Sequence, residues 1–174
     1  MIIRSDQTLR LAIYGVYVAL FNARLQCPDG FLDRDMTRLL TGLMSAKEWS
    51  WRVIGITPEA LEVFAEHDFK RPAGKLQRGH QVDRVVTARE LFQREKPENI
   101  DEFFHTFLKN DQTVLMTNQQ NRHRKVASVP QYIPIDNNEA TLFPSGTLVG
   151  WKHRKVEVDF LRQLHLDRTR TKAT

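Results

Sequence analysis

Apolar residues recur at helical spacing over two segments near the start of the chain, and each spacing predicts a helix. The first segment carries its apolar positions at Leu9, Ile13, Val16, Tyr17 and Leu20. Gly15 and the β-branched residues within it leave a strand as the alternative there. The second segment, which follows a loop at 27–30, carries them at Met36, Leu39, Leu40 and Leu43. The two patterns predict a mainly helical N-terminal part.

The middle of the chain alternates between strand and helix signals. Residues 51–54 have a strand pattern, and a helix is predicted at 58–66, where Thr57 is the N-cap residue and a proline takes the first helical position. Residues 75–86 are expected to be extended. A helix is predicted over 87–95, because its first four residues, Thr-Ala-Arg-Glu, have the spacing of a capping box.

Further helices and one buried strand complete the pattern. The apolar run at 113–117 predicts a short buried strand, after which Asn118 can cap a helix over 119–127. A helix is also predicted after Pro97, with Ile100, Phe103, Phe104 and Phe107 buried, and a final amphipathic helix with Val156, Phe160, Leu161 and Leu164 buried. Strands distributed among helices in this way predict an α+β fold class with mostly helical flanking elements.

The composition sets limits on the kind of protein. A length of 174 residues suits one domain, or one domain with a small appendage, and 41% hydrophobic residues exclude a wholly disordered basic tail. Cys27 is the one cysteine, which excludes an internal disulfide and a zinc site built on cysteine pairs. The apolar run at 11–21 lacks a signal-peptide cleavage site and is too short to span a bilayer. We therefore expect a cytoplasmic protein with no membrane partner.

The positive charge of the chain is concentrated in its middle. Lysine and arginine number 26 against 21 aspartate and glutamate, which gives a formal net charge of +5. The balance is −2 over residues 1–69, +5 over 70–125 and +2 over 126–174. Residues 70–89 contain six basic residues and one acidic residue, Asp83. A charge of this sign favours an anionic partner, either nucleic acid or a membrane surface.

Two polar stretches in this basic segment combine groups that phosphodiester hydrolysis needs. The stretch 77–84 reads Gln-Arg-Gly-His-Gln-Val-Asp-Arg, and the stretch 111–125 runs from Asp111 through the predicted strand into a helix rich in amides, imidazole and arginine. A neutral imidazole can take a proton from water, an amide oxygen can hold a hard divalent cation, and arginines can neutralise phosphate.

These two stretches resemble the HNH, or ββα-metal, endonucleases. The strand at 114–117 and the helix after it are similar to the second strand and metal-bearing helix of that motif, and Arg78-Gly79-His80 is similar to the end of its first strand. The resemblance covers residues 75–125, about a third of the chain. It departs from many members at Gly79, where they have an acidic metal ligand, and at Gln77, where the nonspecific nucleases have aspartate.

The resemblance implies a small ββα-metal core of two short strands and a helix, and a role for each matching residue. His80 would be the general base that deprotonates the attacking water, and Asn121 would hold one Mg²⁺ or another divalent cation, with Asn118 or His123 as alternatives. Arg78 and Arg84 would contact phosphate during catalysis. The remaining candidates for nucleic-acid binding are Lys70, Arg71, Lys75, Arg89, Arg122, Arg124 and Lys125.

Simpler roles exist for several of these residues. The alternative for His80 is a histidine whose ring is simply hydrogen-bonded within the fold, and the alternative for Asn118 is a helix N-cap. Asp83 is a partner either of the His80 imidazole or of a nearby arginine. The signatures of a phosphate-binding loop, a reactive cysteine and the carboxylate-lysine core of many restriction nucleases are absent from the sequence.

The sequence thus predicts a Mg²⁺-dependent endonuclease of restriction or phage type that acts on double-stranded DNA. The nuclease core is expected at 70–127 with a helical insertion. Residues 1–69 are expected to serve dimerisation or DNA contact, and residues 128–174 to form an extension that ends in a helix. The alternative is a nucleic-acid-binding protein without catalysis, which uses the same basic residues to neutralise phosphates.

Overall fold

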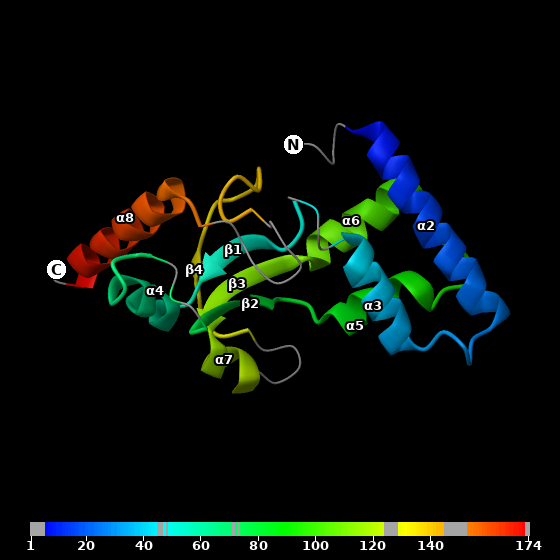
Figure 1. The fold of residues 1–174 in the computed structure, drawn as a ribbon, viewed down its shortest axis with the longest axis horizontal. Coiled ribbons are helices and arrows are strands. Elements are labelled where there is room, and N and C mark those ends of the chain that lie inside the picture. Colours follow the sequence, from blue (N-terminus) through cyan, green and yellow to red (C-terminus); the bar gives the residue numbers. More distant parts are fainter. Residues whose placement is uncertain are drawn as a thin grey trace.

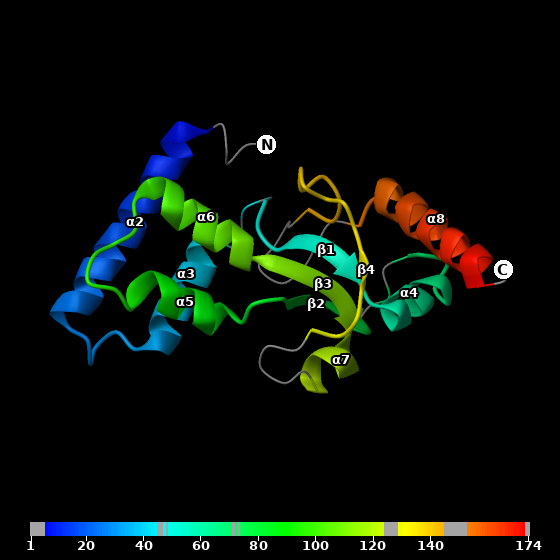
Figure 2. The ribbon, with the colours of Figure 1, turned by 180° about the vertical axis from the view of Figure 1, so that it is seen from behind.

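The protein has an α+β fold, seen in a computed structural model that describes residues 6–44, 47, 49–70, 72, 74–123, 129–144 and 153–172. A small sheet lies in the middle of an elongated molecule, with one group of helices at each end (Figures 1 and 2). The α+β class predicted from the sequence is therefore confirmed.

The sheet has four strands among the described residues, in the order β2-β3-β1-β4. Their bounds are β1 (Arg52–Ile56), β2 (Leu76–His80), β3 (Gln112–Thr117) and β4 (Ile133–Pro134). Strand β3 pairs in parallel with β1 and antiparallel with β2, in a register that sets His80 opposite Thr113. The middle of β3 is buried, as its continuous apolar run requires.

Four helices at one end of the sheet share a single hydrophobic cluster. They are α2 (Gln7–Gln26), α3 (Asp33–Met44), α5 (Arg84–Phe92) and α6 (Ile100–Asn110). Tyr17 lies at its centre, fully buried, with its ring stacked on Phe103 at 4.4 Å between centroids. Its hydroxyl donates to the Leu91 carbonyl at 2.9 Å and accepts from the Glu98 amide at 3.1 Å. The N-terminal helices and those between β2 and β3 therefore form one packed unit.

A second cluster joins the sheet to the helices at its other end. Helices α4 (Pro58–Ala65) and α8 (Lys155–Lys172) pack together there through buried Phe64 and Leu161, against Val53 and Leu115 of the sheet. The short helix α7 (Asn118–His123) follows β3 and contacts β2 (Figure 1). Each cluster contains residues from more than one of the three predicted segments.

Most of the predicted elements are confirmed, but two predicted helix starts are wrong, and residues 124–127 of the helix predicted at 119–127 lie outside the described residues. The chain is extended only as far as His80, and α5 begins at Arg84 with Asp83 at its N-cap. Thr87, predicted as a capping residue, is 4% exposed inside that helix, because α5 packs along α3 from its first turn. The N-cap of α7 is also displaced by one residue, since the Thr117 hydroxyl, rather than Asn118, accepts from the Gln120 amide.

A few residues predicted to face the core are exposed. Val16, Leu39 and Val156 are 44%, 43% and 49% exposed, since each lies at the edge of an apolar stripe whose centre is occupied by its neighbours. The apolar run at 11–21 forms the middle of α2. Within the described residues, no helix is long and apolar enough to cross a membrane.

Asp33, the first residue of α3, holds three helices together. Its carboxylate accepts from Arg89 of α5 at 2.6 Å, from Arg24 of α2 at 2.7 Å and from Gln93 at 3.1 Å. The hydrogen bonds from Arg89 and Arg24 lower the pKa of Asp33 to about 2. Because this pKa is below its ordinary value, the stabilisation is present at neutral pH and is lost as the pH falls from about 4 toward 2.

We expect Asp33→Asn to lower the free energy of unfolding by about 1–2 kcal/mol at pH 7, because the pair energy is partly screened by solvent. The difference from the wild type should shrink below pH 4, where the wild-type carboxylate takes up its proton. Urea unfolding between pH 3 and pH 7 measures both effects. Asp29→Asn, in an exposed loop, is the matched control and should leave stability unchanged. A deficit independent of pH would contradict the assignment.

Candidate functional site

A pocket of about 300 Å³ opens between β2, α7 and the start of α5. It is called the β2–α7 pocket below. The residues that line it are Trp51, Gln77, Arg78, Gly79, His80, Asp83, Arg84 and Asn121. The pocket therefore brings together the predicted base His80 and the predicted metal ligand Asn121, which lie 41 positions apart in the sequence, with two predicted phosphate-binding arginines.

His80 is held at the end of β2 by a buried carboxylate. Its Nε2 atom lies 3.1 Å from Oδ1 of Asp111, and the two side chains are 7% and 6% exposed. The other carboxylate oxygen of Asp111 accepts from the backbone N–H of Trp51 at 2.7 Å. A carboxylate accepts hydrogen bonds only, so it favours the tautomer in which Nε2 carries the proton and Nδ1 carries the lone pair.

Trp51 covers one side of the His80 ring. The indole meets the imidazole edge to face, with 4.8 Å between centroids and 75° between planes. Trp51 has a φ of 57°, which is costly for a residue with a bulky side chain. Its amide is held by Asp111, and its carbonyl accepts from Arg78 at 2.7 Å and from the Thr113 hydroxyl at 3.0 Å. Its amide is thus tied to the residue before β3, and its carbonyl to residues of β2 and β3.

Arg84 packs on the same indole ring. Its guanidinium carbon is 4.9 Å from the centroid of the Trp51 ring, and its Nη1 atom is 3.4 Å from the Thr41 hydroxyl. The side chain as a whole is exposed, but the loss of solvation around its guanidinium group lowers the pKa of Arg84. The nearby Asp111 carboxylate opposes this effect and only partly offsets it. Arg84 is therefore a positive charge at the edge of the pocket.

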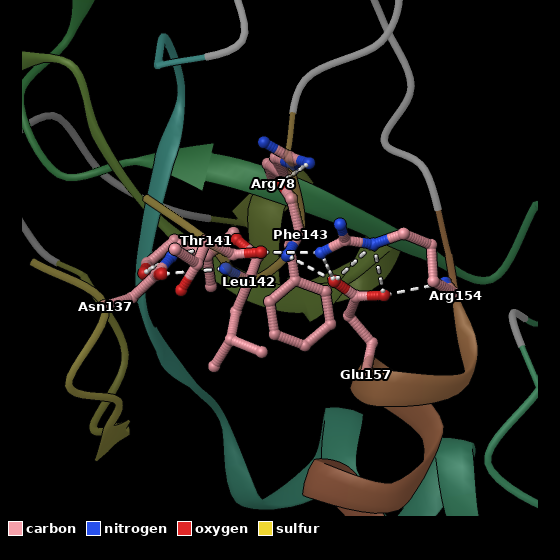
Figure 3. Close-up of polar contacts among 8 residues, drawn as sticks. Arg78, Asn137, Thr141, Leu142, Phe143, Arg154 and Glu157 are labelled. Carbon is pink, nitrogen blue, oxygen red and sulfur yellow. Dashed lines mark hydrogen bonds and ion pairs between the residues drawn. The ribbon is translucent and has the colours of Figure 1, made fainter. Parts of the chain in front are cut away.

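Arg78 has a structural role in the wall of the pocket. It is 8% exposed, and its guanidinium donates to the carbonyls of Trp51 at 2.7 Å and of Phe143 at 2.5 Å. The Phe143 amide in turn donates to the fully buried Glu157, which pairs with Arg154 at 2.5 Å (Figure 3). Burial would raise the pKa of Glu157, but hydrogen bonds from Arg154 and Phe143 outweigh it and lower that pKa. Arg78 thus anchors the segment before α8 to β2.

Asn121 reaches the pocket because α7 lies very close to β2. A Cβ atom on Gly79 would come within 2.6 Å of the Met116 sulfur and 2.9 Å of Oδ1 of Asn121. Glycine at this position therefore leaves room for the amide oxygen over the strand. Within the part of the chain that the structure describes, the half-buried Asn121 side chain makes no hydrogen bond.

The other two candidate metal ligands lie elsewhere on α7. Asn118 donates from its backbone N–H to the Lys75 carbonyl at 3.0 Å and from its side chain to the Gly74 carbonyl, so it joins α7 to the chain before β2. His123 is exposed, with Nδ1 2.9 Å from the Gln119 carbonyl. Neither lines the β2–α7 pocket. The described residues contain no group of three or more histidine, cysteine, aspartate or glutamate residues that could hold a metal ion.

The remaining basic candidates do not gather at the pocket. Lys70 is exposed 3.4 Å from Asp68, and Lys75 lies 3.0 Å from Nε2 of His67. Arg89 pairs with Asp33 across the helices, and Arg122 is exposed on α7. The structure therefore spreads these four residues over several surfaces. Arg71, Arg124 and Lys125 lie outside the described residues.

Sequence reasoning missed Asp111 and Trp51. Asp83, for which the sequence left either the His80 imidazole or a nearby arginine as partner, lines the pocket at the N-cap of α5, whereas Asp111 makes the 3.1 Å contact with His80. The available signal was an acidic residue directly before a buried strand. That signal could be interpreted only once the register of β2 on β3 was known, because this register brings the start of β3 beside the end of β2.

Comparison of the chain with models of protein families, with curated proteins and with solved structures finds no match. The functional assignment therefore depends on the geometry of the β2–α7 pocket.

We expect Gly79→Ala to reduce the free energy of unfolding by about 1–3 kcal/mol, because the added methyl group must displace Met116 and Asn121. Urea unfolding measures the change. Gly15→Ala is the matched control, since nothing lies within 4 Å of a Cβ atom there, and alanine in a helix should raise stability by up to about 1 kcal/mol. A Gly79→Ala protein as stable as the wild type would show that the close approach of α7 is not required.

Proposed function

We propose that the protein is a Mg²⁺-dependent endonuclease that hydrolyses phosphodiester bonds in double-stranded DNA. The observation that carries this proposal is the single pocket lined by both His80 and Asn121, in which His80 is hydrogen-bonded to the buried Asp111. A base whose orientation is held by a carboxylate and an amide oxygen that can bind a cation are the two groups that hydrolysis of a phosphate diester most needs.

His80 is the general base in this proposal. Its Nδ1 atom takes a proton from a water molecule as the water oxygen attacks phosphorus. The bond from phosphorus to the 3′ oxygen then breaks, and the leaving oxygen takes a proton from solvent. The Asp111 carboxylate stabilises the imidazolium that forms and keeps the ring in one orientation, which is the role that a buried carboxylate has beside other catalytic histidines.

Asn121 would hold the divalent cation. Its amide oxygen lies over Gly79 at the pocket, and its side chain has no competing hydrogen bond among the described residues. Mg²⁺ commonly keeps several of its waters, so a single protein ligand from α7 is compatible with its chemistry. When bound, such an ion stabilises the charge that develops on the phosphate and the departing oxygen. Arg84, at the edge of the same pocket, can neutralise a further phosphate charge.

The arrangement of β2, β3 and α7 also supports the proposal. Two antiparallel strands are followed by a helix that contacts the first of them, with the base at the end of that strand and the amide on the helix. This is the order that a ββα-metal core would have. A homodimer of the restriction or phage type stays a prediction from the sequence.

We expect His80→Ala to abolish nicking of supercoiled plasmid in the presence of Mg²⁺, with at least a hundredfold loss of rate, because the attacking water loses its base. Agarose gels with and without a chelator measure the activity. His165→Ala on α8, where the histidine contacts exposed Glu62 and the edge of the Phe69 ring and does not line the β2–α7 pocket, is the matched control and should cut like the wild type.

Three outcomes of the plasmid assay carry different meanings. Discrete fragments would indicate a sequence-specific restriction enzyme, and a smear would indicate a nonspecific nuclease. Tight, salt-sensitive binding without cleavage by any divalent cation would contradict the proposal in favour of a non-catalytic nucleic-acid-binding protein.

A second prediction concerns Asp111→Asn. The Trp51 N–H requires an oxygen at 2.7 Å, so the new amide should turn its NH₂ group toward His80. His80 would then accept at Nε2 and carry its proton on Nδ1, where the base should be. We expect the turnover number to fall by about 10³–10⁴ while the affinity for DNA stays unchanged.

Nitrogen NMR of the labelled imidazole at pH 8 provides the direct readout. The wild type should show the proton on Nε2, and Asp111→Asn should show it on Nδ1. Asp101→Asn, which alters an exposed aspartate on the neighbouring α6, is the control for the NMR measurement. The same tautomer in the wild type and Asp111→Asn would overturn the role given to Asp111.

A further inference from the structure

A second groove, of about 390 Å³, shares no lining residue with the β2–α7 pocket. It runs between the start of α2, the length of α6 and the first residues of β1 and β3, and it is called the α6 groove below. Its basic residues are Arg10 of α2, Arg52 of β1 and Lys109 of α6. Three elements that are distant in the sequence thus contribute one positive charge each.

Arg10 is already in place to contact a ligand. Its Nη2 atom lies 2.7 Å from Asp101, and its guanidinium carbon lies 4.5 Å from the centroid of the Phe104 ring. The side chain is only 12% exposed, so little rotamer entropy remains to be lost on binding. Asp101 is the one carboxylate that lines the α6 groove, and Arg10 neutralises it.

Arg52 and Lys109 supply charge that the described residues do not neutralise. Their side chains make no ion pair and no hydrogen bond within the described part of the chain, although most other arginines there are paired. Arg52 stands opposite Gln112 in the parallel register of β1 and β3, so a guanidinium and an amide donor lie side by side. The α6 groove therefore presents several hydrogen-bond donors and an excess of positive charge.

We propose that the α6 groove binds phosphate groups of a nucleic-acid backbone, as a contact site separate from the β2–α7 pocket. Guanidinium forks and an ammonium group match phosphate oxygens in geometry and charge. A protein partner would need an apolar anchor at the centre of its interface. The α6 groove offers none, because Phe104 is 1% exposed and Leu108 is half-buried. The choice of nucleic acid as the partner rests on the proposed function.

The α6 groove is lined by sequence neighbours of the residues that surround His80. Trp51 lines the β2–α7 pocket and Asp111 contacts His80, whereas their immediate neighbours Arg52 and Gln112 line the α6 groove. The two sites thus share a stretch of backbone, although no residue lines both cavities. A nucleic acid held in the α6 groove therefore contributes to affinity and does not touch the reacting phosphate.

The test measures binding apart from cleavage. A fluorescently labelled 30-base-pair duplex is titrated with the full chain in chelator, and anisotropy gives the dissociation constant at several salt concentrations. We expect Arg52→Gln/Lys109→Gln to weaken binding at least tenfold and to reduce the slope of log K against log salt by about 2, since each phosphate contact contributes about 0.9. Arg52→Glu/Lys109→Glu should weaken binding further.

Arg38→Gln/Lys96→Gln and Arg38→Glu/Lys96→Glu are the matched controls. They change net charge equally at exposed sites outside both cavities. Thermal unfolding of every variant verifies that it is folded. Equal losses in the groove and control variants would overturn the proposal, because net charge alone would then explain the effect. A groove variant that loses binding to polyglutamate but keeps its affinity for the duplex would also overturn it, in favour of an acidic protein partner.

The outcomes also separate this inference from the proposed function. Groove-dependent binding by a protein that cuts no DNA would support the α6 groove and contradict the endonuclease. Cleavage that depends on His80, together with unchanged duplex affinity in the groove variants, would contradict the α6 groove alone.

Discussion

The structure around the pocket depends on the hydrogen bonds of one buried carboxylate. Asp111 lies where α6 ends and β3 begins, and it accepts from both the His80 ring and the Trp51 backbone. A charge that is 6% exposed persists only if its oxygens are satisfied, and here each oxygen has a separate donor. The ends of β2 and of the segment before β1 are therefore held against the start of β3 by the same group that orients His80.

Two further close contacts shape the β2–α7 pocket, one between α7 and β2 and one between β2 and the segment before α8. Gly79 allows α7 to approach β2, and Arg78 ties β2 to the segment that precedes α8. Gln120 adds a link from α7 to α4, since its side chain accepts from Thr57 at 2.8 Å and donates to Glu59 at 2.9 Å. Asn121 therefore lies on a short helix that contacts β2 and is hydrogen-bonded to the start of α4.

Local signals in the sequence were sufficient for most elements. The Thr57-Pro58 start of α4, the apolar run of β3 and the phenylalanine spacing of α6 each reflect chemistry within a few residues. The structure brings His80 and Asn121 to one pocket, and their roles in catalysis stay predictions. What could not be predicted depends on contacts between distant segments, such as the register that brings Asp111 to His80. The role of Arg78 is of this kind, because its partners are carbonyls of residues 51 and 143, which no side-chain pattern reveals.

The position of α5 and α6 between β2 and β3 has a consequence for how the chain folds. The two strands can pair only after the segment 81–111 has closed a loop, and that segment completes its own core with α2 and α3. During synthesis the N-terminal helices must wait with an apolar face exposed until α5 and α6 emerge. Although α2 and α3 contribute no residue to the β2–α7 pocket, they pack against the two helices that fill the loop between β2 and β3, and so stabilise the closure that pairs those strands.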